Sequence, residues 1–460
     1  MASDSFGKLG KGKRGIGAII WLILLLVIVA AVVLAVKLFE LGAPQITLVS
    51  NAHLLGRKSS IDLSFADRKN GIRDLEVSLR QGKNQVVLLR RQFTRGSLLE
   101  KGPLEVPETV KIDAATLALV NGRADLIVTG HDFSEWHWGK GNETMVSFPL
   151  IFDIKPPQLH LVDAPRFIKP GSSAIVIYRA NEEIAKHGVT IDGYFYQGFP
   201  VPGRGEGIYG AMIALPYYTE TIKKAMISGY DRAGNADKIS LGLSVRNVRK
   251  KKDRINISDN FLKWKMPEFA QYYPELNAMG DDLLKQYIFV NNEIRARNGK
   301  KISGICRNSS PKRLWKGRFG RMRRSAKRAG FADYRSYYYH GKVIDHQVHQ
   351  GVDLASVRHA RVEAANNGKV VYADYLGIYG NVVILDHGQG VFSLYAHLSR
   401  IEVAVGDLVK KGSKLGISGN TGMAGGDHLH FAILVNGIFV NPLEWWDKSW
   451  LRLNIEQYLK

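Results

Sequence analysis

The feature that most constrains this chain is an uncharged, apolar run of 21 residues near its start, from Ile16 to Val36. A helix rises about 1.5 Å per residue, so this run is long enough to span the roughly 30 Å hydrocarbon core of a bilayer. The apolar region of a cleavable signal peptide is shorter, about 7–15 residues, which favours an uncleaved transmembrane helix over cleavage near Ala35. Residues 1–15 are polar and basic, so the positive-inside rule predicts a cytoplasmic basic tail. We therefore expect a single-pass protein of the cell (inner) membrane whose C-terminal domains are periplasmic or otherwise extracytoplasmic.

Length and charge limit the interpretation of the rest of the chain. A chain of 460 residues is long enough for about three domains. Its 64 Lys and Arg outnumber 42 Asp and Glu, and the net charge of +22 predicts an anionic partner: nucleic acid, lipid headgroups or an acidic wall polymer. The single cysteine, Cys306, excludes an intrachain disulfide and any multi-cysteine metal site.

Short runs of alternating apolar and polar residues dominate the first half. Residues 44–155 contain runs such as "SIDLSFAD" and "RADLIVTGHD", separated by turn residues, and residues 156–247 repeat the pattern after a Pro-Pro boundary. The corner sequences "IVTGHDFSEW" and "MISGYDRAGNA" form a weak internal repeat. Both stretches resemble bacterial immunoglobulin-like domains, so we expect two Ig-like β-sandwiches that act as spacers or protein-binding modules.

A charged linker over 246–254 is expected to lead into a helical, basic connector over 255–330. Asp259 can cap the first helix, and Asp281 or Asp282 the second. Ten Lys and Arg crowd into 307–328. Behind a membrane anchor, that patch predicts contact with an anionic wall polymer or lipid rather than with nucleic acid, although a solvated face is an equally good interpretation.

Histidines concentrate near the C-terminus, in a region that reads as all β from Gly341, with a hairpin signal at Asn436-Gly437. In "HLH", His428 and His430 are two residues apart and share one face of a strand, while Leu429 points into the core behind it. A divalent metal that binds both rings in their neutral form removes the repulsion that two protonated rings would suffer.

The motif "HQGVD" adds a nitrogen ligand, His349, and an oxygen ligand, Asp353. Two histidines and one aspartate leave a fourth position of zinc open to water, which is typical of a catalytic site. Amide hydrolysis also needs a base for the water proton and a donor for the oxyanion. His397 is a candidate for that work, although by itself it reads as a core histidine. His346 lies three residues before His349 and could compete as a ligand, whereas His340, His359 and His387 are expected in loops and turns.

The region from about Gly341 to Trp446 resembles the M23 family of metallopeptidases, of the lysostaphin and LytM type. The residues that carry the resemblance are "HQGVDLA", "GKVVYADYLGIYGNVVILDHG", "LYAHLS", "VGDLVKKGSKLGISGNTG" and "HLHF". It implies that His349, Asp353 and His430 bind Zn2+, and that His397 and His428 are the catalytic pair. Two departures concern substrate preference rather than zinc binding: Asp427 replaces a common Pro, and Ala432 replaces a frequent Glu.

These observations predict a mainly β protein with a transmembrane helix, two Ig-like sandwiches, a helical connector and a peptidase domain over 331–450. The resemblance implies a membrane-anchored zinc metalloendopeptidase that hydrolyses the peptide cross-links of bacterial peptidoglycan. The alternative is a catalytically silent wall-binding protein that regulates another hydrolase, but silent members lack part of the ligand set, and all five positions are occupied here. We expect no nucleic-acid partner. The sequence does not decide which cross-link is cut.

Overall fold

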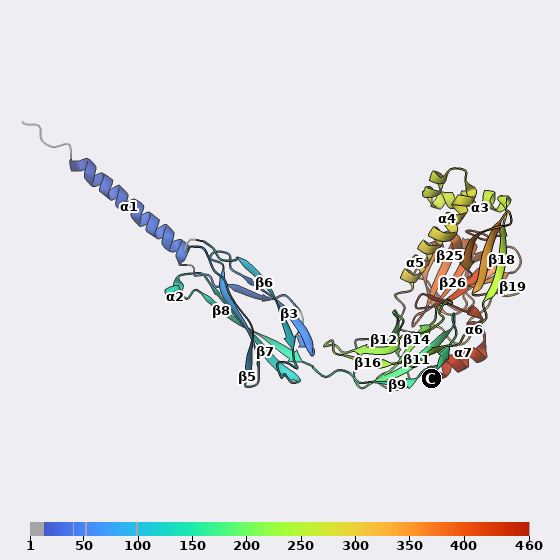
Figure 1. The fold of residues 1–460 in the computed structure, drawn as a ribbon, viewed down its shortest axis with the longest axis horizontal. Helices are drawn as coiled ribbons and strands as arrows, with labels where there is room; N and C mark the ends of the chain where they lie inside the picture. Colours follow the sequence, from blue (N-terminus) through green and yellow to red (C-terminus); the bar gives the residue numbers. More distant parts are fainter. Residues whose placement is uncertain (1–12, 40, 51–52, 98–99, 460) are drawn as a thin grey trace, which may run out of the picture. The chain divides into compact units, whose positions relative to one another are not determined.

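The computed structural model describes residues 13–39, 41–50, 53–97 and 100–459 (Figure 1). The predicted cytoplasmic tail therefore lies almost entirely outside the described residues. The chain forms two compact units. The first extends to Pro156 and takes in Arg232–Asn235, and the second comprises Pro157–Asp231 and Ala236–Lys460.

The apolar run forms helix α1, Lys13–Leu38. Its Gly17–Leu38 portion has a mean hydropathy of 3.5, and none of it is buried against protein. A helix of this length and composition fits a membrane anchor or a signal sequence.

The first unit contains two sheets around one apolar core, antiparallel except for the short parallel pair of β2 and β8 at one edge of the larger sheet. One sheet has three strands in the order β1-β3-β6 and the other has five in the order β2-β8-β7-β4-β5. Side chains alternate between buried and exposed along β6, as a half-buried strand requires. The strands are β1 Gln45–Leu48, β2 Leu54–Leu55, β3 Lys58–Ala66, β4 Ile72–Gln81, β5 Asn84–Gln92, β6 Glu105–Asp113, β7 Gly122–Asp132 and β8 Glu143–Phe152, with a short helix, α2, at Trp136–Gly139. The Ig-like character of this region stays a prediction.

The second β region differs from a simple repeat of the first. Its strands follow one seven-stranded path, β16-β15-β12-β13-β14-β11-β9, because β13 pairs with both β12 and β14. A parallel pair, β10 and β17, lies apart from this sheet. The strands are β9 Leu159–Asp163, β10 Phe167–Ile168, β11 Ser173–Ala180, β12 Lys186–Ile191, β13 Tyr194–Pro200, β14 Ile208–Ala214, β15 Ala225–Tyr230, β16 Ala236–Ser240 and β17 Ser244–Val245.

The expected linker over 246–254 is partly wrong, because its end belongs to a strand. Strand β18, Lys251–Ile257, pairs in parallel with β20, Asp333–Tyr339. Strand β20 pairs in turn with β21, Lys342–Val348, in antiparallel register. The charged residues of this strand indicate a linker, but Ile257 at its end is buried among apolar side chains that include Tyr337.

Helices cover only the first part of the expected connector. They are α3 Asp259–Tyr272, the 3₁₀ turn η1 Pro274–Met279, α4 Leu283–Phe289, the π-helical segment η2 Val290–Ile294 and α5 Arg295–Ile305. Asp282 caps α4 by accepting from the Lys285 N–H, as predicted. Ser258, rather than Asp259, caps α3, because its hydroxyl accepts from the Phe261 N–H.

Residues 306–325 contain no helix and run along the C-terminal domain. Trp315 and Phe319 are buried there against Trp445, with ring centroids 5.6 and 5.2 Å from its ring. The basic segment 307–328 is therefore fixed to the domain by its aromatic residues.

The C-terminal domain is built on a ten-stranded sheet whose main path is β19-β22-β29-β26-β25-β24-β27. The Asn436-Gly437 hairpin is confirmed: β29 and β30 are antiparallel, and φ is 50° and 83° at the two turn residues. The strands are β19 Ala326–Ala329, β22 Val352–Ala355, β23 Arg361–Glu363, β24 Gly368–Tyr375, β25 Asn381–Gly388, β26 Val391–Ile401, β27 Leu408–Val409, β28 Lys414–Ser418, β29 Leu429–Val435 and β30 Ile438–Val440, with the 3₁₀ turn η3 at Gly377–Tyr379.

The all-β prediction is wrong at the end of the chain, where two helices and a 3₁₀ turn follow the sheet. They are α6 Pro442–Trp446, α7 Lys448–Asn454 and η4 Glu456–Leu459. Asn441 and Asp447 cap the two helices through their side chains. Asn and Asp are strong N-cap residues, so these helix starts were readable in the sequence.

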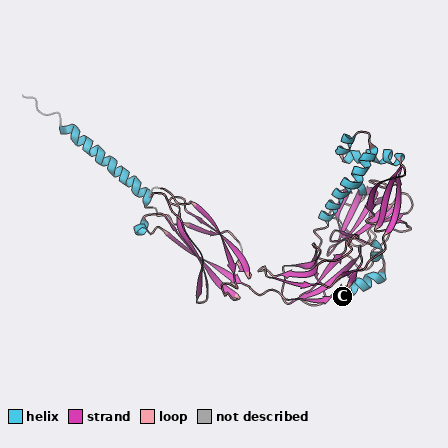
Figure 2. Cartoon of the chain, viewed as in Figure 1, coloured by secondary structure: helices cyan, strands magenta, loops and turns pink. Residues whose placement is uncertain are grey.

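The two faces of this sheet pack against different partners. One face shares an apolar core with the second β region, and the other packs against the helical segment Asp259–Ile305, beside β25 and β26 (Figures 1 and 2). Ala432 lies on the helix-covered face, buried in the cluster that includes Ile294 and Leu394. A glutamate there would be buried among apolar groups, which accounts for the alanine at this position.

Candidate metal centre and catalytic site

The three predicted metal ligands come together at the junction of two strands. Asp353 on β22 lies directly opposite His430 on β29, and directly opposite residues of an antiparallel pair face the same side. His349 precedes β22, and its backbone is fixed by hydrogen bonds between its C=O and the Ala332 N–H and between its N–H and the Asp333 C=O. Its Nδ1 donates to the Gly330 carbonyl at 2.7 Å. In the neutral ring, that bond keeps the proton on Nδ1 and leaves the Nε2 lone pair for a metal.

The ligand atoms form a tight triangle. His349 Nε2 lies 2.9 Å from Asp353 Oδ1 and 3.0 Å from His430 Nδ1, and His430 Nδ1 lies 2.9 Å from Asp353 Oδ1. Donors that hold zinc tetrahedrally at about 2.0–2.2 Å lie roughly 3.3 Å apart. Three acceptors that converge at this spacing, from buried or nearly buried side chains, fit a divalent cation.

Gly351 explains how the His430 ring fits. A Cβ at position 351 would lie 2.5 Å from His430 Nε2 and 2.8 Å from the Phe431 carbonyl. His430 Nε2 is itself buried without a hydrogen-bond partner among the described residues, so Nδ1 is the ring nitrogen that serves the site. Position 351 must therefore be glycine, because any larger side chain would collide with the His430 ring.

Arg335 on β20 supports the aspartate from behind. Its guanidinium lies 3.3 Å from Asp353 Oδ2 and 3.7 Å from a carboxylate oxygen of Asp253 on β18. Burial alone would raise the pKa of Asp353, but the His349 charge and hydrogen bonds from the site histidines outweigh it, and the pKa lies well below its usual value. The carboxylate is therefore ionised and available as a ligand.

A β-bulge directs His397 into the site. Between Tyr395 and Leu398, β26 carries one residue more than β25 opposite, and His397 has a left-handed φ of 62°. In strict alternation its side chain would lie on the far face with Tyr395, which packs in the other core. Left-handed backbone costs a non-glycine residue about 1 kcal/mol or more and is concentrated at functional sites.

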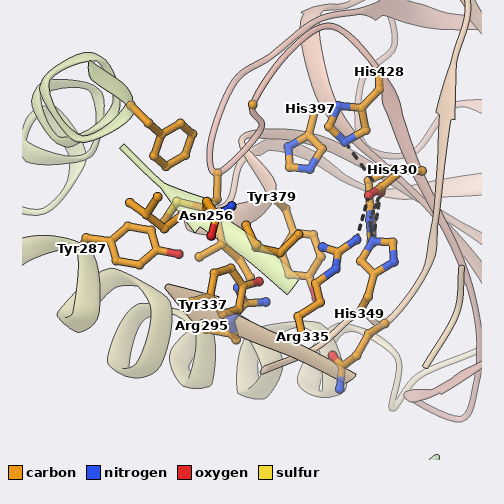
Figure 3. Close-up of a pocket in the computed structure, with 18 of the residues that line it drawn as sticks. Asn256, Tyr287, Arg295, Arg335, Tyr337, His349, Tyr379, His397, His428 and His430 are labelled. Carbon is orange, nitrogen blue, oxygen red and sulfur yellow. Dashed lines mark hydrogen bonds and ion pairs between the residues drawn. The ribbon is translucent and has the colours of Figure 1, made fainter. Parts of the chain in front are cut away.

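Both histidines outside the triangle have one nitrogen fixed by a backbone carbonyl. His397 Nδ1 donates to the Thr421 carbonyl at 2.8 Å, and His428 Nδ1 donates to the Gly426 carbonyl at 2.8 Å. Their rings are 4.8 Å apart, and His428 Nε2 lies 3.6 Å from Asp353 Oδ1. Neither Nε2 is used by these backbone hydrogen bonds, and both residues line the cavity (Figure 3).

The histidines of the site differ in protonation. Burial lowers the pKa of His397, assisted by the charges of His428 and His430. Burial, as the largest cause, also lowers the pKa of His430, to about 4. For His428 burial acts in the same direction, but the hydrogen bond and charge of Asp353 outweigh it, so its pKa is raised.

Asp427, in place of the common proline, fixes the turn before "HLH". One of its carboxylate oxygens accepts from the Ser418 hydroxyl at 2.6 Å, and the other accepts from the His359 N–H at 2.8 Å. A carboxylate that bridges two segments restrains this turn through hydrogen bonds, where a proline would restrain it through its ring.

The structure separates the remaining histidines from the site. His346 is exposed on β21 with its ring 3.1 Å from the Ser336 hydroxyl, so it is not part of the ligand group. His340 and His359 lie in turns, as expected. The same expectation is wrong for His387, which is fully buried in β25 and hydrogen-bonded to Ser393 and the Asn367 carbonyl.

Sequence reasoning missed the far wall of the site. A cavity of about 430 Å³ extends from the five site residues to β18, α3, α4 and α5 (Figure 3). Tyr379 lies beside His430 with ring centroids 5.6 Å apart, and the opposite wall includes Ile257, Phe261, Tyr287 and Arg295. No motif marks these wall residues, because only tertiary packing brings them to the site.

Comparison with known proteins finds sequence similarity across the region of this site. Residues 347–442 match the sequence model of Peptidase family M23. The chain is 39% identical over 97 residues to the DD-carboxypeptidase/endopeptidase Mpg of Neisseria meningitidis, and 38% identical over 96 residues to the peptidoglycan DD-endopeptidase ShyA of Vibrio cholerae. Each match covers 21% of this chain and 22% of the relative, so the chain spans about a fifth of the length of these curated relatives. Among solved structures, the catalytic domain of lysostaphin from Staphylococcus simulans is 33% identical, with 26% of this chain and 92% of that chain covered and a TM-score of 0.23.

Proposed function

The C-terminal region of this chain is a peptidase M23 domain, and from this premise we propose that the protein is a membrane-anchored zinc metalloendopeptidase of the cell wall. Its substrates in this proposal are the peptide cross-links of bacterial peptidoglycan. The observation that carries the proposal is the triangle of His349 Nε2, Asp353 Oδ1 and His430 Nδ1. The names of relatives that act on peptidoglycan support the substrate class.

His349, Asp353 and His430 would hold the zinc ion, which supplies a Lewis acid that polarises a carbonyl and acidifies water. Arg335 forms an ion pair with Asp353 that orients its carboxylate. His397 and His428 stand beside the ligands with their Nδ1 atoms fixed. In this proposal the pair takes the proton of the attacking water and donates a hydrogen bond to the developing oxyanion, the two functions that amide hydrolysis requires.

The rest of the chain fits delivery of this domain to the wall. Helix α1 would anchor it in the inner membrane with the N-terminus in the cytoplasm, and the two β regions, read as Ig-like, would act as spacers or binding modules. The basic segment 307–328 would contact an anionic wall polymer or lipid, because Trp315 and Phe319 fix it to the domain while its Arg and Lys side chains remain largely exposed.

The full-length chain, purified in detergent, tests this function. We expect about one zinc per chain and hydrolysis of purified peptidoglycan, both lost in His430→Ala and both kept in the control His346→Ala. A wild-type chain that binds peptidoglycan but holds no zinc and cuts no bond would favour the silent, wall-binding alternative.

A further inference from the structure

The cavity beside the metal centre has a polar group with no visible use in the folded chain. Tyr287 on α4 is fully buried, and its hydroxyl has no hydrogen-bond partner among the described residues. The hydroxyl points into the cavity, toward the site histidines (Figure 3). A buried hydroxyl without a partner is costly, which indicates that a ligand supplies an acceptor.

A guanidinium on the same wall lacks an anionic partner. Arg295 is half-buried and hydrogen-bonds only to neutral groups, with Nε donating to the Asn291 carbonyl at 3.0 Å and a terminal nitrogen donating to the Asn291 side chain. Within the described part of the chain, no carboxylate pairs with it. The guanidinium is always charged, and a charged donor in a cavity binds best to a carboxylate or phosphate.

Helix geometry brings these two groups to one place. The π-helical segment Val290–Ile294 separates α4 from α5, and such segments often occur at functional sites. Burial raises the pKa of the Tyr379 hydroxyl to about 12, and the positive charge of Arg295 opposes that rise, as it does for Tyr287. Arg295, Tyr287 and Tyr379 all line the cavity that also contains His430.

Arg335, the other guanidinium of the cavity, is not available to bind an anionic ligand. Its guanidinium already lies within 4 Å of two carboxylates, Asp353 and Asp253, so its charge is matched within the fold. Arg295 is the guanidinium of this cavity that is left for an incoming anion.

We propose that Arg295 and Tyr287 form a subsite for a free carboxylate of the substrate peptide, next to the amide that is cut. Arg295 pairs with the carboxylate and the Tyr287 hydroxyl donates to it, while Ile257 and Phe261 contact the adjacent apolar portion. This inference rests on the proposed endopeptidase function and specifies its substrate as an anionic cross-link, in preference to a neutral bridge such as oligoglycine.

A matched pair of cross-linked peptides tests the subsite, one with a free carboxylate beside the scissile amide and one with the carboxamide. The affinity of each is measured for the zinc-loaded His397→Gln chain, in which hydrolysis is slow, and kcat/KM is measured for the wild type. The carboxylate peptide should be favoured roughly 10- to 100-fold in both measurements, the contribution expected of a charged hydrogen bond.

Variants of the same helical segment assign the preference. Arg295→Met should reduce it to within about threefold, Arg295→Lys should restore part of it, and Tyr287→Phe should lower it several-fold. Arg297→Met is the matched control, because Arg297 is exposed on the same helix and paired with Glu275 and Glu293. Zinc content and thermal unfolding verify that each variant is folded.

Equal affinity for the two peptides, or a preference that survives in Arg295→Met, would overturn the subsite. A preference in binding that Arg295→Met abolishes would uphold it even if the wild type cut neither peptide; in that case the proposed function, and not the subsite, would have failed.

Discussion

The two ends of the cavity are built in contrasting ways. At the metal end, His349, Asp353 and His430 direct their acceptors at one point, and a hydrogen bond or ion pair fixes His349 and Asp353 from behind. At the helical end, the Tyr287 hydroxyl has no hydrogen-bond partner and the Arg295 guanidinium no carboxylate partner among the described residues. The difference fits our proposals that one end holds a resident ion and that the other binds a ligand that enters and leaves.

The largest effect should follow from breaking the metal end. Asp353→Ala removes the oxygen ligand and leaves Arg335 without its closer partner. We expect zinc to be lost and peptidoglycan hydrolysis to fall by at least about 1,000-fold, as when a group essential to the reaction is removed. Zinc analysis and dye release from labelled walls provide the measurements. An active, zinc-bound Asp353→Ala chain would show that the triangle is not the metal site.

His397→Gln should separate chemistry from metal binding at the same end. The ring lies beside the triangle but outside it, so zinc content should stay near one per chain. The rate should fall by about 100-fold or more, the usual contribution of a general acid or base. Hydrolysis at the wild-type rate would indicate that His397 is a buried histidine without a catalytic function. Loss of zinc would indicate that it is a metal ligand.

At the helical end, we next predict how tightly the helices pack against the sheet. Ile294 is fully buried in the cluster that joins the helices to the sheet. Ile294→Ala should lower the free energy of unfolding by about 2–5 kcal/mol, measured by denaturant titration. Val343→Ala, at a position that is 48% exposed, should change it by less than about 0.5 kcal/mol. A small effect of Ile294→Ala would mean that the helices are a loose connector rather than a wall of the domain.

A smaller effect should appear away from both ends, at Glu444 on α6. Burial raises the pKa of this carboxyl to about 7, and its two oxygens lie 2.8 and 2.7 Å from the Ser172 hydroxyl. Because the folded pKa exceeds the ordinary value of 4.5, the stabilisation is complete below pH 4.5 and is lost as the pH rises through 7. The stability difference between wild type and Glu444→Gln should therefore fall by about 3 kcal/mol at most over this range. A difference that does not vary with pH would show that Glu444 titrates normally.

The same contrast explains how far the sequence can predict this protein. The proposed ligands and His428 lie in short motifs in or just before the neighbouring strands β22 and β29, so period-two alternation and motif spacing suffice to predict that they meet. The family resemblance predicts His397, but alternation alone places its ring on the wrong face, because a single-residue bulge decides its direction. Nothing local links Tyr287 or Arg295 to a site more than 50 residues later in the chain. Their role depends on how the helices pack against the sheet.

Charge is misleading in one segment, where packing decides the structure. The Lys and Arg residues of 246–254 indicate a linker, yet Lys251 begins a strand whose Asp253 reaches Arg335. An edge strand tolerates outward charges, so composition alone does not distinguish it from a linker. The helical pattern likewise indicates a connector, whereas Met266, Ile294 and Ile302 are buried in a core that they share with the C-terminal sheet.

The most direct test of the proposed endopeptidase function is to identify the ends that appear when the zinc-loaded chain acts on purified peptidoglycan. We expect that cross-linked peptide dimers disappear and that new amino and carboxyl ends form within the cross-link, with the glycan strands intact. New reducing sugar ends, or cross-links that persist while zinc is bound, would contradict it.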